Sequence, residues 1–304
     1  MENSQTNYFY QVFGLIISTS IECPELLSSH TECADVEIKI GNVPKQLNKI
    51  SKQDQNYQLN SEQLLLKVEN VGSYLIEKGQ KITISPSELG IYDDTRLVLL
   101  GSALGIIQHQ RGRLTLHASA LTNGKDTILI CGNSGAGKST TANILIKNGF
   151  KLLSDDLAVI DFKNDQPWLM PAYPQSKLWQ DATDKLSIET QGLKRVLSNL
   201  DKFAYPLHQH FSNTPTKVIH GLILGKADIT EPKLVKLPTV SKIDLMKRHT
   251  YRKRLLSNTQ KQTNIQQCAK LASTLNIAAL HRPLESNSLE SVLDLITNKF
   301  INRN

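Results

Sequence analysis

The segment TILICGNSGAGKSTTANILIK, residues 127–147, decides how the rest of the chain is interpreted. It starts with an apolar run, Thr127–Cys131, that has the length of a buried strand, and it ends with Ser139–Lys147, which is typical of a helix. Between them, Gly132–Ser139 matches the pattern G-x-x-x-x-G-K-S completely. A loop of this kind between a strand and a helix predicts a binding site for the phosphates of a nucleoside triphosphate.

The residue types of this loop suit phosphate binding. Its glycines let successive backbone N–H groups turn toward phosphate oxygens, and the helix N-terminus adds partial positive charge. Lys138 is expected to neutralise the β and γ phosphates, and Ser139 is expected to ligate Mg²⁺. The nucleotide-binding residues expected on this basis are Gly132, Asn133, Ser134, Gly135, Ala136, Gly137, Lys138, Ser139 and Thr140.

A pair of carboxylates, Asp155 and Asp156, follows one helix later in the segment KLLSDDLAVI at 151–160. At that position a carboxylate pair would face the γ phosphate. One carboxylate can hold the metal, and the other can accept a proton from an attacking hydroxyl. Adjacent carboxylates are also common in solvated turns, but the apolar strands on both sides favour the functional interpretation.

Around this centre the chain is expected to form two domains. Residues 1–93 contain short β-branched or alternating runs and predict a β-rich N-terminal domain. Residues 94–304 predict a catalytic domain of the α/β class, in which strands and helices alternate. The expected strands are 8–18, 34–40, 63–68, 73–77, 81–85, 116–121, 127–131, 152–153, 157–162, 217–225 and 276–280; the expected helices are 94–110, 139–147, 243–257, 265–275 and 288–300.

Composition narrows the class of protein. The chain of 304 residues is 39% hydrophobic and 21% charged, as in ordinary globular proteins, and it lacks the ~18-residue apolar run of a membrane span. Its start has no basic region ahead of the first apolar run, so we expect a cytoplasmic protein. The net charge of +7 is spread along the chain and aromatics are only 6%, which disfavours nucleic acid and favours a polyanionic ligand. The cysteines, at 23, 33, 131 and 268, form no CxxC pair and have no histidine at zinc-ligand spacing.

Several motifs together resemble the kinase domain of HPr kinase/phosphorylase, whose fold is related to that of phosphoenolpyruvate carboxykinase. These motifs are LHASA at 116–120, GNSGAGKST at 132–140 and LLSDD at 152–156. A resemblance over nearly the whole chain is to HPr-kinase-like proteins encoded beside lasso-peptide genes. It is carried by YQVFGLIISTSIECPEL at 10–26, ADVEIKIGNVP at 34–44, RGRLTLHASAL at 111–121, PAYPQSKLWQDA at 171–182, MKRHTYRKRLL at 246–256 and LHRPL at 280–284.

The resemblance implies an ATP- and Mg²⁺-dependent kinase that phosphorylates a serine hydroxyl, with the C-terminal serine of a lasso precursor peptide as the expected acceptor. It implies that Asp155 is the general base and that Asp156 ligates Mg²⁺ together with Ser139. His117 would lie beside Asp155 and the transferred phosphoryl group. From the residues alone, a hydrogen-bonded core histidine is the favoured interpretation of His117. HPr kinase is a hexamer, so the resemblance leaves a homo-oligomer open.

One departure from the family concerns the acceptor. HPr kinases carry an E-x-R-G-L-G run after the aspartate pair, and this sequence has no such run; Gln191-Gly-Leu-Lys194 is a poor match. The departure disfavours HPr as the substrate and disfavours the reverse, phosphorolytic reaction. An HPr-type protein kinase, a small-molecule kinase and a non-catalytic, nucleotide-dependent scaffold of a peptide-maturation complex remain alternatives.

Three basic residues are secondary candidates for substrate contacts. Lys177, in PQSKLW, is expected to reach a phosphate or carboxylate, or else to be a surface lysine beside a buried tryptophan. Arg248 and Arg252 are four residues apart in the helix expected at 243–257, where they would share a face and clamp an anion, or else simply be solvated. His208 and His210 lack a third ligand nearby, which disfavours a metal site.

Overall fold

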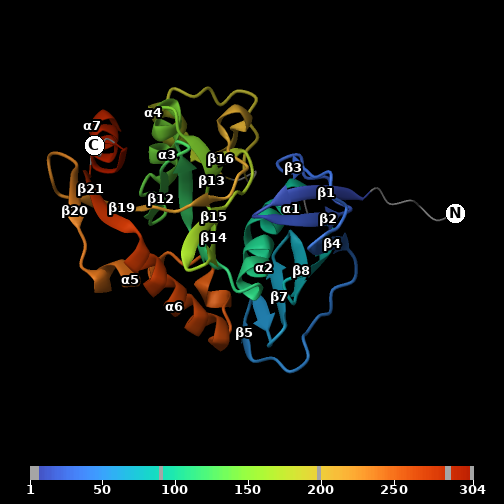
Figure 1. The fold of residues 1–304 in the computed structure, drawn as a ribbon. Helices are drawn as coiled ribbons and strands as arrows, with labels where there is room; N and C mark the ends of the chain where they lie inside the picture. Colours follow the sequence, from blue (N-terminus) through green and yellow to red (C-terminus); the bar gives the residue numbers. More distant parts are fainter. Residues whose placement is uncertain (1–6, 89–91, 197–199, 285–288, 302–304) are drawn as a thin grey trace. The chain divides into compact units, whose positions relative to one another are not determined.

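The computed structural model describes residues 7–88, 92–196, 200–284 and 289–301, and it is a mixed α/β structure with several sheets (Figure 1). Two compact units make up the chain: Met1–Leu114 with Arg252–Asn264, and Thr115–Tyr251 with Ile265–Asn304. The helical segment expected to open the second domain at residue 94 therefore lies in the first unit. No helix among the described residues combines the length and the apolar character that crossing a membrane requires.

The first unit contains a nine-stranded sheet in the order β3-β1-β2-β4-β9-β8-β7-β6-β5. Its strands are β1 (Tyr8–Val12), β2 (Leu15–Thr19), β3 (Leu27–Ser28), β4 (Val36–Ile40), β5 (Lys52–Asp54), β6 (Tyr57–Leu59), β7 (Gln63–Val68), β8 (Gly72–Glu77) and β9 (Lys81–Pro86). The run expected as one strand at 8–18 is a hairpin, because Phe13 and Gly14 both have positive φ, 52° and 66°, as a tight two-residue turn requires.

The helix expected at 94–110 is confirmed, with an interruption. It runs as α1 (Tyr92–Val98), a π-helical segment η1 (Leu99–Ala103) and α2 (Leu104–Gln110). The side chain of Gln110 fixes its end to the sheet, because it accepts from the N–H of Gly79 at 2.8 Å and donates to the carbonyl of Ile76 at 3.2 Å. The later residues of this unit are the 3₁₀ turn η3 (Lys253–Leu255) and the first residues of α6 (Asn258–Thr274).

The second unit is built on a six-stranded sheet in the order β13-β11-β12-β19-β21-β20. Its strands are β11 (Ala118–Thr122), β12 (Thr127–Gly132), β13 (Lys151–Ser154), β19 (His220–Ala227), β20 (Lys233–Lys236) and β21 (Asn276–Pro283). The strands β12, β19 and β21 are parallel. Each contains a continuous buried apolar run, which explains why each could be predicted from the sequence.

Two helices cover one face of this sheet. They are α3 (Lys138–Lys147) and α7 (Leu289–Ile296), which continues into the π-helical segment η4 (Thr297–Ile301) (Figure 1). Apolar side chains of both helices join those of β12 and β19 in one buried cluster, which includes Ile130, Leu145, Leu222 and Val292. This packing fixes the point at which β12 ends and α3 begins.

The chain passes between the central sheet and a second, four-stranded sheet at two places. A four-stranded sheet contains β10 (Leu114–Leu116), β14 (Ala158–Lys163), β15 (Gln166–Met170) and β18 (Thr216–Lys217). The chain passes from β10 to β11 at His117, and from β13 to β14 at Asp155–Leu157. The strand expected at 116–121 is thus divided between two sheets.

A two-stranded sheet of β16 (Gln175–Trp179) and β17 (Lys202–Pro206) completes the unit, with Trp179 opposite Lys202. The remaining elements are α4 (Gln180–Lys185), the 3₁₀ turn η2 (His208–His210), α5 (Thr239–Arg248) and the second part of α6. The sequence did not predict β15, β16, β17, β20 or α4, because each is short and its partner is distant or its pattern is mixed.

The helix expected at 243–257 is wrong in its second half. Helix α5 ends at Arg248, because residues 249–251 pair as a strand with residues 115–117: His117 N–H donates to the His249 carbonyl at 2.7 Å and Tyr251 N–H to the Thr115 carbonyl at 3.0 Å. Arg252 then takes a left-handed conformation with φ of 48°. Arg248 and Arg252 therefore do not share a helix face.

Candidate active site

The Gly132–Ser139 loop joins the end of β12 to the start of α3, as predicted. Gly135 and Gly137 have φ of 75° and 89°, a left-handed conformation that favours glycine. A Cβ added at Gly137 would also lie only 2.6 Å from Nη2 of Arg282. The backbone conformation therefore favours glycine at residue 137, whereas a Cβ there would require the Arg282 side chain to shift.

Lys138 lies at the centre of this loop. Its Nζ donates to the main-chain oxygens of Gly132 at 2.9 Å and Asn133 at 3.2 Å. Burial lowers the pKa of Lys138, and the nearby carboxylates of Asp156 and Asp155 oppose that effect. An ammonium group held on backbone carbonyls beside a helix N-terminus is a concentrated positive charge that suits phosphate oxygens.

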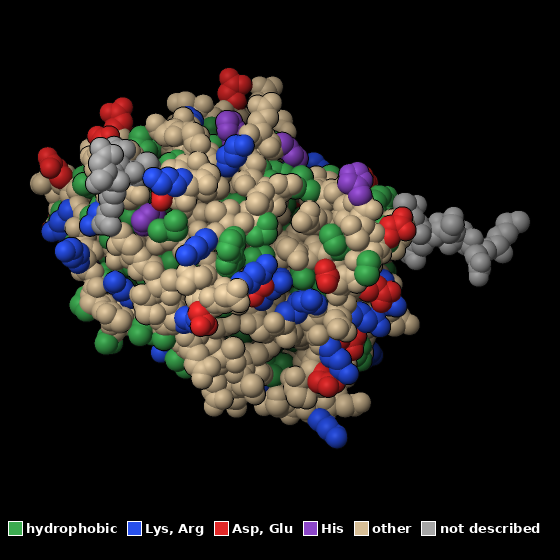
Figure 2. Space-filling view, viewed as in Figure 1, with side chains coloured by type: hydrophobic (Ala, Val, Ile, Leu, Met, Phe, Trp, Pro, Cys, Tyr) green, Lys and Arg blue, Asp and Glu red, His purple; other side chains and the backbone are tan. Residues whose placement is uncertain are grey.

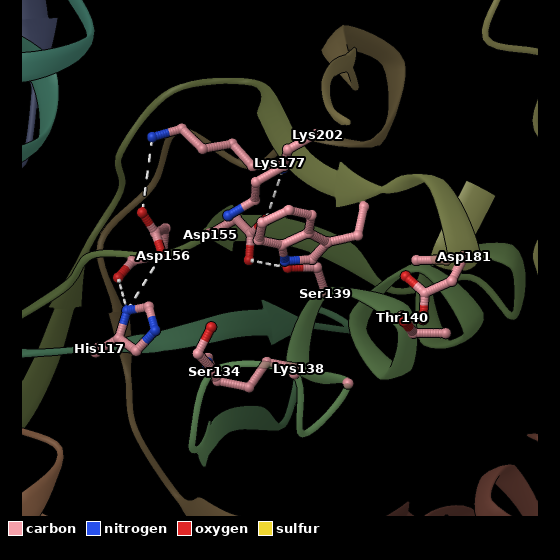
Figure 3. Close-up of a pocket in the computed structure, with 14 residues that line it drawn as sticks. His117, Ser134, Lys138, Ser139, Thr140, Asp155, Asp156, Lys177, Asp181 and Lys202 are labelled. Atoms are coloured by element: carbon pink, nitrogen blue, oxygen red, sulfur yellow. Dashed lines mark hydrogen bonds and ion pairs between the residues drawn. The ribbon is translucent and has the colours of Figure 1, made fainter. Parts of the chain in front are cut away.

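Asp155 is a buried carboxylate that is fully used as a hydrogen-bond acceptor. Its Oδ1 accepts from the hydroxyls of Ser119 at 2.5 Å and Ser139 at 3.2 Å. Its Oδ2 accepts from the hydroxyl of Ser176 at 2.8 Å and the main-chain N–H of Lys177 at 2.9 Å. Four donors from three separate segments of the sequence thus fix both oxygens, and Figure 3 shows the contact between Asp155 and Ser139.

Asp156 points to different partners from its neighbour, because its φ of 71° turns the chain sharply between β13 and β14. Its Oδ1 lies 3.2 Å from Nδ1 of His117, and its Oδ2 lies 3.7 Å from Nζ of Lys177 (Figure 3). Nδ1 of His117 also lies 3.0 Å from the main-chain oxygen of Asp156, so Nδ1 faces two acceptor oxygens and carries a proton.

The surroundings of Asp156 keep it ionised. Burial alone would raise the pKa of its carboxyl group, but the hydrogen bond from His117 and the positive charges of Lys177, His117 and Lys202 together hold this pKa well below its ordinary value. The carboxylate retains access to the pocket, since 26% of its side chain is exposed.

These contacts differ from the pairing expected for the two carboxylates, whose catalytic roles remain predictions. Ser139 was expected to share a metal ion with Asp156, and His117 was expected beside Asp155. The structure instead brings Ser139 to Asp155 and His117 to Asp156. The sequence cannot distinguish the two orders, because the direction of each side chain depends on the left-handed turn at residue 156.

Lys177 lies in the site, and the alternative interpretation of its neighbourhood is wrong. Lys177 is 7% exposed, whereas Trp179 is 39% exposed and lines the pocket. Burial alone would lower the pKa of Lys177, but Tyr173 and Asp156 outweigh it, and the pKa is raised. Strand alternation places both side chains on the pocket side of β16.

The loop, the acid pair and Lys177 surround a single open pocket of about 600 Å³, including the solvent at its mouth. The described residues that line it are His117, Ser134, Gly135, Gly137, Lys138, Ser139, Thr140, Asp155, Asp156, Lys177, Trp179, Asp181, Ala182 and Lys202. Gly132, Asn133 and Ala136 form the loop's underside, where Asn133 accepts from Lys138 and Ala136 joins the core.

The remaining sequence candidates lie elsewhere. Arg248 is absent from the described residues that line the pocket; its side chain is 67% exposed and pairs with Asp244 at 2.7 Å. Arg252 belongs to the first unit. His208 and His210 are exposed in a 3₁₀ turn, and no group of three or more His, Cys, Asp or Glu side chains among the described residues is arranged to hold a metal ion.

Sequence reasoning missed several residues of the site. Ser119 and Ser176 hold Asp155, Lys202 places its Nζ 5.5 Å from the centre of the Trp179 ring, and Arg282 donates from Nη2 to the carbonyl of Ala136. Ser119 and Ser176 stand beside candidates that were identified, two residues after His117 and one before Lys177. Lys202 carries no local signal in the sequence.

On the face that Figure 2 shows, Lys and Arg side chains are interspersed with acidic ones. Within the pocket, Lys138, Lys177 and Lys202 are balanced by the carboxylates of Asp155, Asp156 and Asp181. The glycine-rich loop and the helix N-terminus therefore favour a phosphate ligand, and net charge adds nothing to this preference.

No protein-family model matches this chain, and no curated protein matches it. Among solved structures, the chain is similar to the Hpr(Ser) kinase/phosphatase from Coxiella burnetii, with 13% sequence identity and a TM-score of 0.31. The match covers 60% of this chain and 94% of that chain. A match with this TM-score gives no information about the function of this chain.

Proposed function

We propose that this chain is a kinase that transfers the γ-phosphoryl group of Mg²⁺·ATP to a hydroxyl group, with a serine of a peptide as the acceptor. The observation that carries the proposal is the division of the acid pair. Asp155 is held against Ser139 of the phosphate loop, while Asp156 is held against His117 and remains accessible from the same pocket. A phosphotransferase needs one carboxylate for the metal and another for the acceptor.

The residues at the loop fit a magnesium ion. Ser139 Oγ and Asp155 Oδ1 are 3.2 Å apart and form the hydroxyl–carboxylate pair that commonly holds Mg²⁺ together with substrate phosphates. When bound, the ion would neutralise negative charge on the phosphates, and Ser139 and Asp155 would hold it. Ser119, Ser176 and the N–H of Lys177 orient Asp155 in advance, so its position does not depend on the ion.

Asp156 is proposed as the proton acceptor, in place of Asp155. In the transfer, the acceptor oxygen forms a bond to the γ phosphorus and the bond from that phosphorus to the β–γ bridging oxygen breaks, so its electron pair leaves with ADP. The O–H bond of the acceptor breaks and its proton passes to the Asp156 carboxylate. The transition state of such a transfer is loose, so the proton leaves the acceptor late and a carboxylate of low basicity is sufficient to accept it. His117 and Lys177 orient it.

Three lysines complete the proposed machinery. Lys138 is positioned for the β and γ phosphates. Lys177 and Lys202 add positive charge on the opposite side of the pocket, where both lower the pKa of Asp156. Charge from several directions stabilises a phosphoryl group in flight better than a single contact.

The peptide acceptor rests on the sequence. The motifs RGRLTLHASAL and PAYPQSKLWQDA resemble those of kinases that phosphorylate the C-terminal serine of lasso precursor peptides, and the E-x-R-G-L-G run of HPr kinases is missing. Lys177, beside the proposed acceptor position, has a charge that suits the terminal carboxylate of such a peptide. A cytoplasmic location fits this role.

The test is transfer of label from [γ-³²P]ATP to a short peptide ending in serine, in the presence of Mg²⁺. The wild-type chain is expected to label this peptide and not the same peptide ending in alanine. Asp156→Asn should abolish transfer and leave Mg²⁺·ATP binding nearly intact. Asp244→Asn, in an exposed ion pair of α5, is the matched control and should keep full activity. Failure of the wild type to phosphorylate any serine peptide while binding ATP would contradict the proposal.

A further inference from the structure

The pocket has two ends with different chemistry. His117 and Asp156 lie together at one end, and Thr140 and Asp181 lie at the other, with Lys138 and Ser139 of the loop between them (Figure 3). If the γ phosphate meets Asp156, as the proposed function requires, the rest of the nucleotide has to extend away from the acid pair. The nucleoside must then lie at the end of the pocket where β16 runs into α4.

An aromatic ring is available at that end. Trp179 is the last residue of β16, two residues before Asp181, and it lines the pocket together with Asp181 and Ala182. The opposite face of the strand is occupied, since Ser176 accepts a hydrogen bond from Asn143 of α3 at 3.1 Å and Leu178 is fully buried. Alternation along the strand therefore directs Trp179 into the pocket, next to Lys177 on the same face.

The exposure of this indole is not explained by packing. Trp179 is one of only six large hydrophobic residues that are exposed among those described, and the only aromatic one in the pocket. The ammonium group of Lys202 lies over one face of the ring, 5.5 Å from its centre, so a stacked base would take the other face. A large ring that is left open in a phosphate-binding pocket has the properties of a stacking platform, since every nucleobase has a flat π face.

We propose that Trp179 is the platform on which the base of the bound nucleoside triphosphate stacks, and that Asp181 accepts a hydrogen bond from the nucleoside. Asp181 can only accept hydrogen bonds, so its partner is a ribose hydroxyl or a base amino group. This inference rests on the proposed function, because the acid pair sets the direction of the nucleotide. It assigns the adenosine part of ATP to residues outside the glycine-rich loop.

The experiment compares two ligands that share the phosphate chain and differ in the base: Mg²⁺·ATP and magnesium tripolyphosphate, measured by isothermal titration calorimetry. Trp179→Ala should weaken Mg²⁺·ATP by about 5- to 150-fold, the range of one base–aromatic stack, and leave tripolyphosphate within about twofold. Trp179→Phe should retain most of the ATP affinity. Trp168→Phe, which changes the other tryptophan of the chain on β15, is the matched control and should change neither ligand.

The Trp168→Phe variant also provides a readout that does not require removing Trp179. Its only tryptophan is Trp179, so Mg²⁺·ATP should change its emission markedly and tripolyphosphate should change it little. An equal loss of affinity for both ligands in Trp179→Ala, or equal emission changes with both, would overturn the inference. Unchanged affinity of Trp179→Ala for Mg²⁺·ATP would also overturn the inference. A wild-type chain that binds neither ligand would overturn the proposed function itself, a separate outcome.

Discussion

Replacing Asp155 by asparagine tests how much the buried carboxylate contributes to stability. The amide oxygen can still accept from Ser119 and Ser139, but the amide nitrogen then faces the fixed N–H of Lys177. One buried donor without a partner costs about 1–3 kcal/mol, and exchanging a charged acceptor for a neutral one weakens the surviving bonds by about 1 kcal/mol. We therefore expect Asp155→Asn to lower the free energy of unfolding by about 2–4 kcal/mol.

Urea unfolding followed by tryptophan fluorescence measures this change where it occurs, because Trp168 and Trp179 both belong to the second unit. Asp244→Asn is the control: it removes an exposed i,i+4 ion pair and should cost no more than about 0.5 kcal/mol. A free energy of unfolding for Asp155→Asn within about 0.5 kcal/mol of the wild-type value, the cost expected for the control, would contradict this prediction. It would show that the four hydrogen bonds do not hold Asp155 as described.

Three further predictions follow from the same contacts. The pKa of Asp156 in the folded state lies below its unfolded value of about 3.9. The ionised carboxylate therefore contributes its full stabilisation above about pH 3.9, and this stabilisation is lost as the pH falls toward the folded-state pKa. In urea titrations, the difference in free energy of unfolding between wild type and Asp156→Asn should be smaller at pH 3 than at pH 6. Lys138→Ala should weaken Mg²⁺·ATP by about 10- to 150-fold in calorimetry, since it removes charged hydrogen bonds, and an affinity close to that of the wild type would contradict its role. Arg282→Gln removes the guanidinium group that contacts Ala136 and lies against Gly137 together with its charge, and should lower ATP affinity more than Arg282→Lys does. Equal effects of the two substitutions would show that the positive charge at residue 282 does not contribute.

The parts of the site that the sequence predicted are those encoded locally. The Gly132–Ser139 loop needs a strand, a glycine pattern and a helix in succession, and all three are contiguous in the chain. Asp155 and Asp156 follow between two apolar strands, as expected. The same locality explains why the parallel strands of the central sheet were found and the short hairpin of β16 and β17 was not.

The contacts that assign roles come from distant segments. Ser119 and Ser176 reach Asp155 from 36 and 21 residues away, and Lys202 reaches the pocket from β17, a strand without a local pattern that predicts it. The prediction that the helix continues beyond Arg248 is wrong for a similar reason. Residues 249–251 pair with residues 115–117, and this pairing overrides helix propensity. The alternative with Lys177 at the surface and Trp179 buried has their exposures the wrong way round. Side chains alternate between the two faces of a strand, but without the partner strand β17 the sequence does not show which face of β16 is buried.

The division of the acid pair is tested most directly by electron paramagnetic resonance of Mn²⁺, used in place of Mg²⁺, bound to the protein–ATP complex. Asp155→Asn and Ser139→Ala are expected to weaken Mn²⁺ binding to that complex, and Asp156→Asn is expected to leave it close to the wild-type value. Loss of Mn²⁺ affinity in Asp156→Asn with retention in Asp155→Asn would contradict the account.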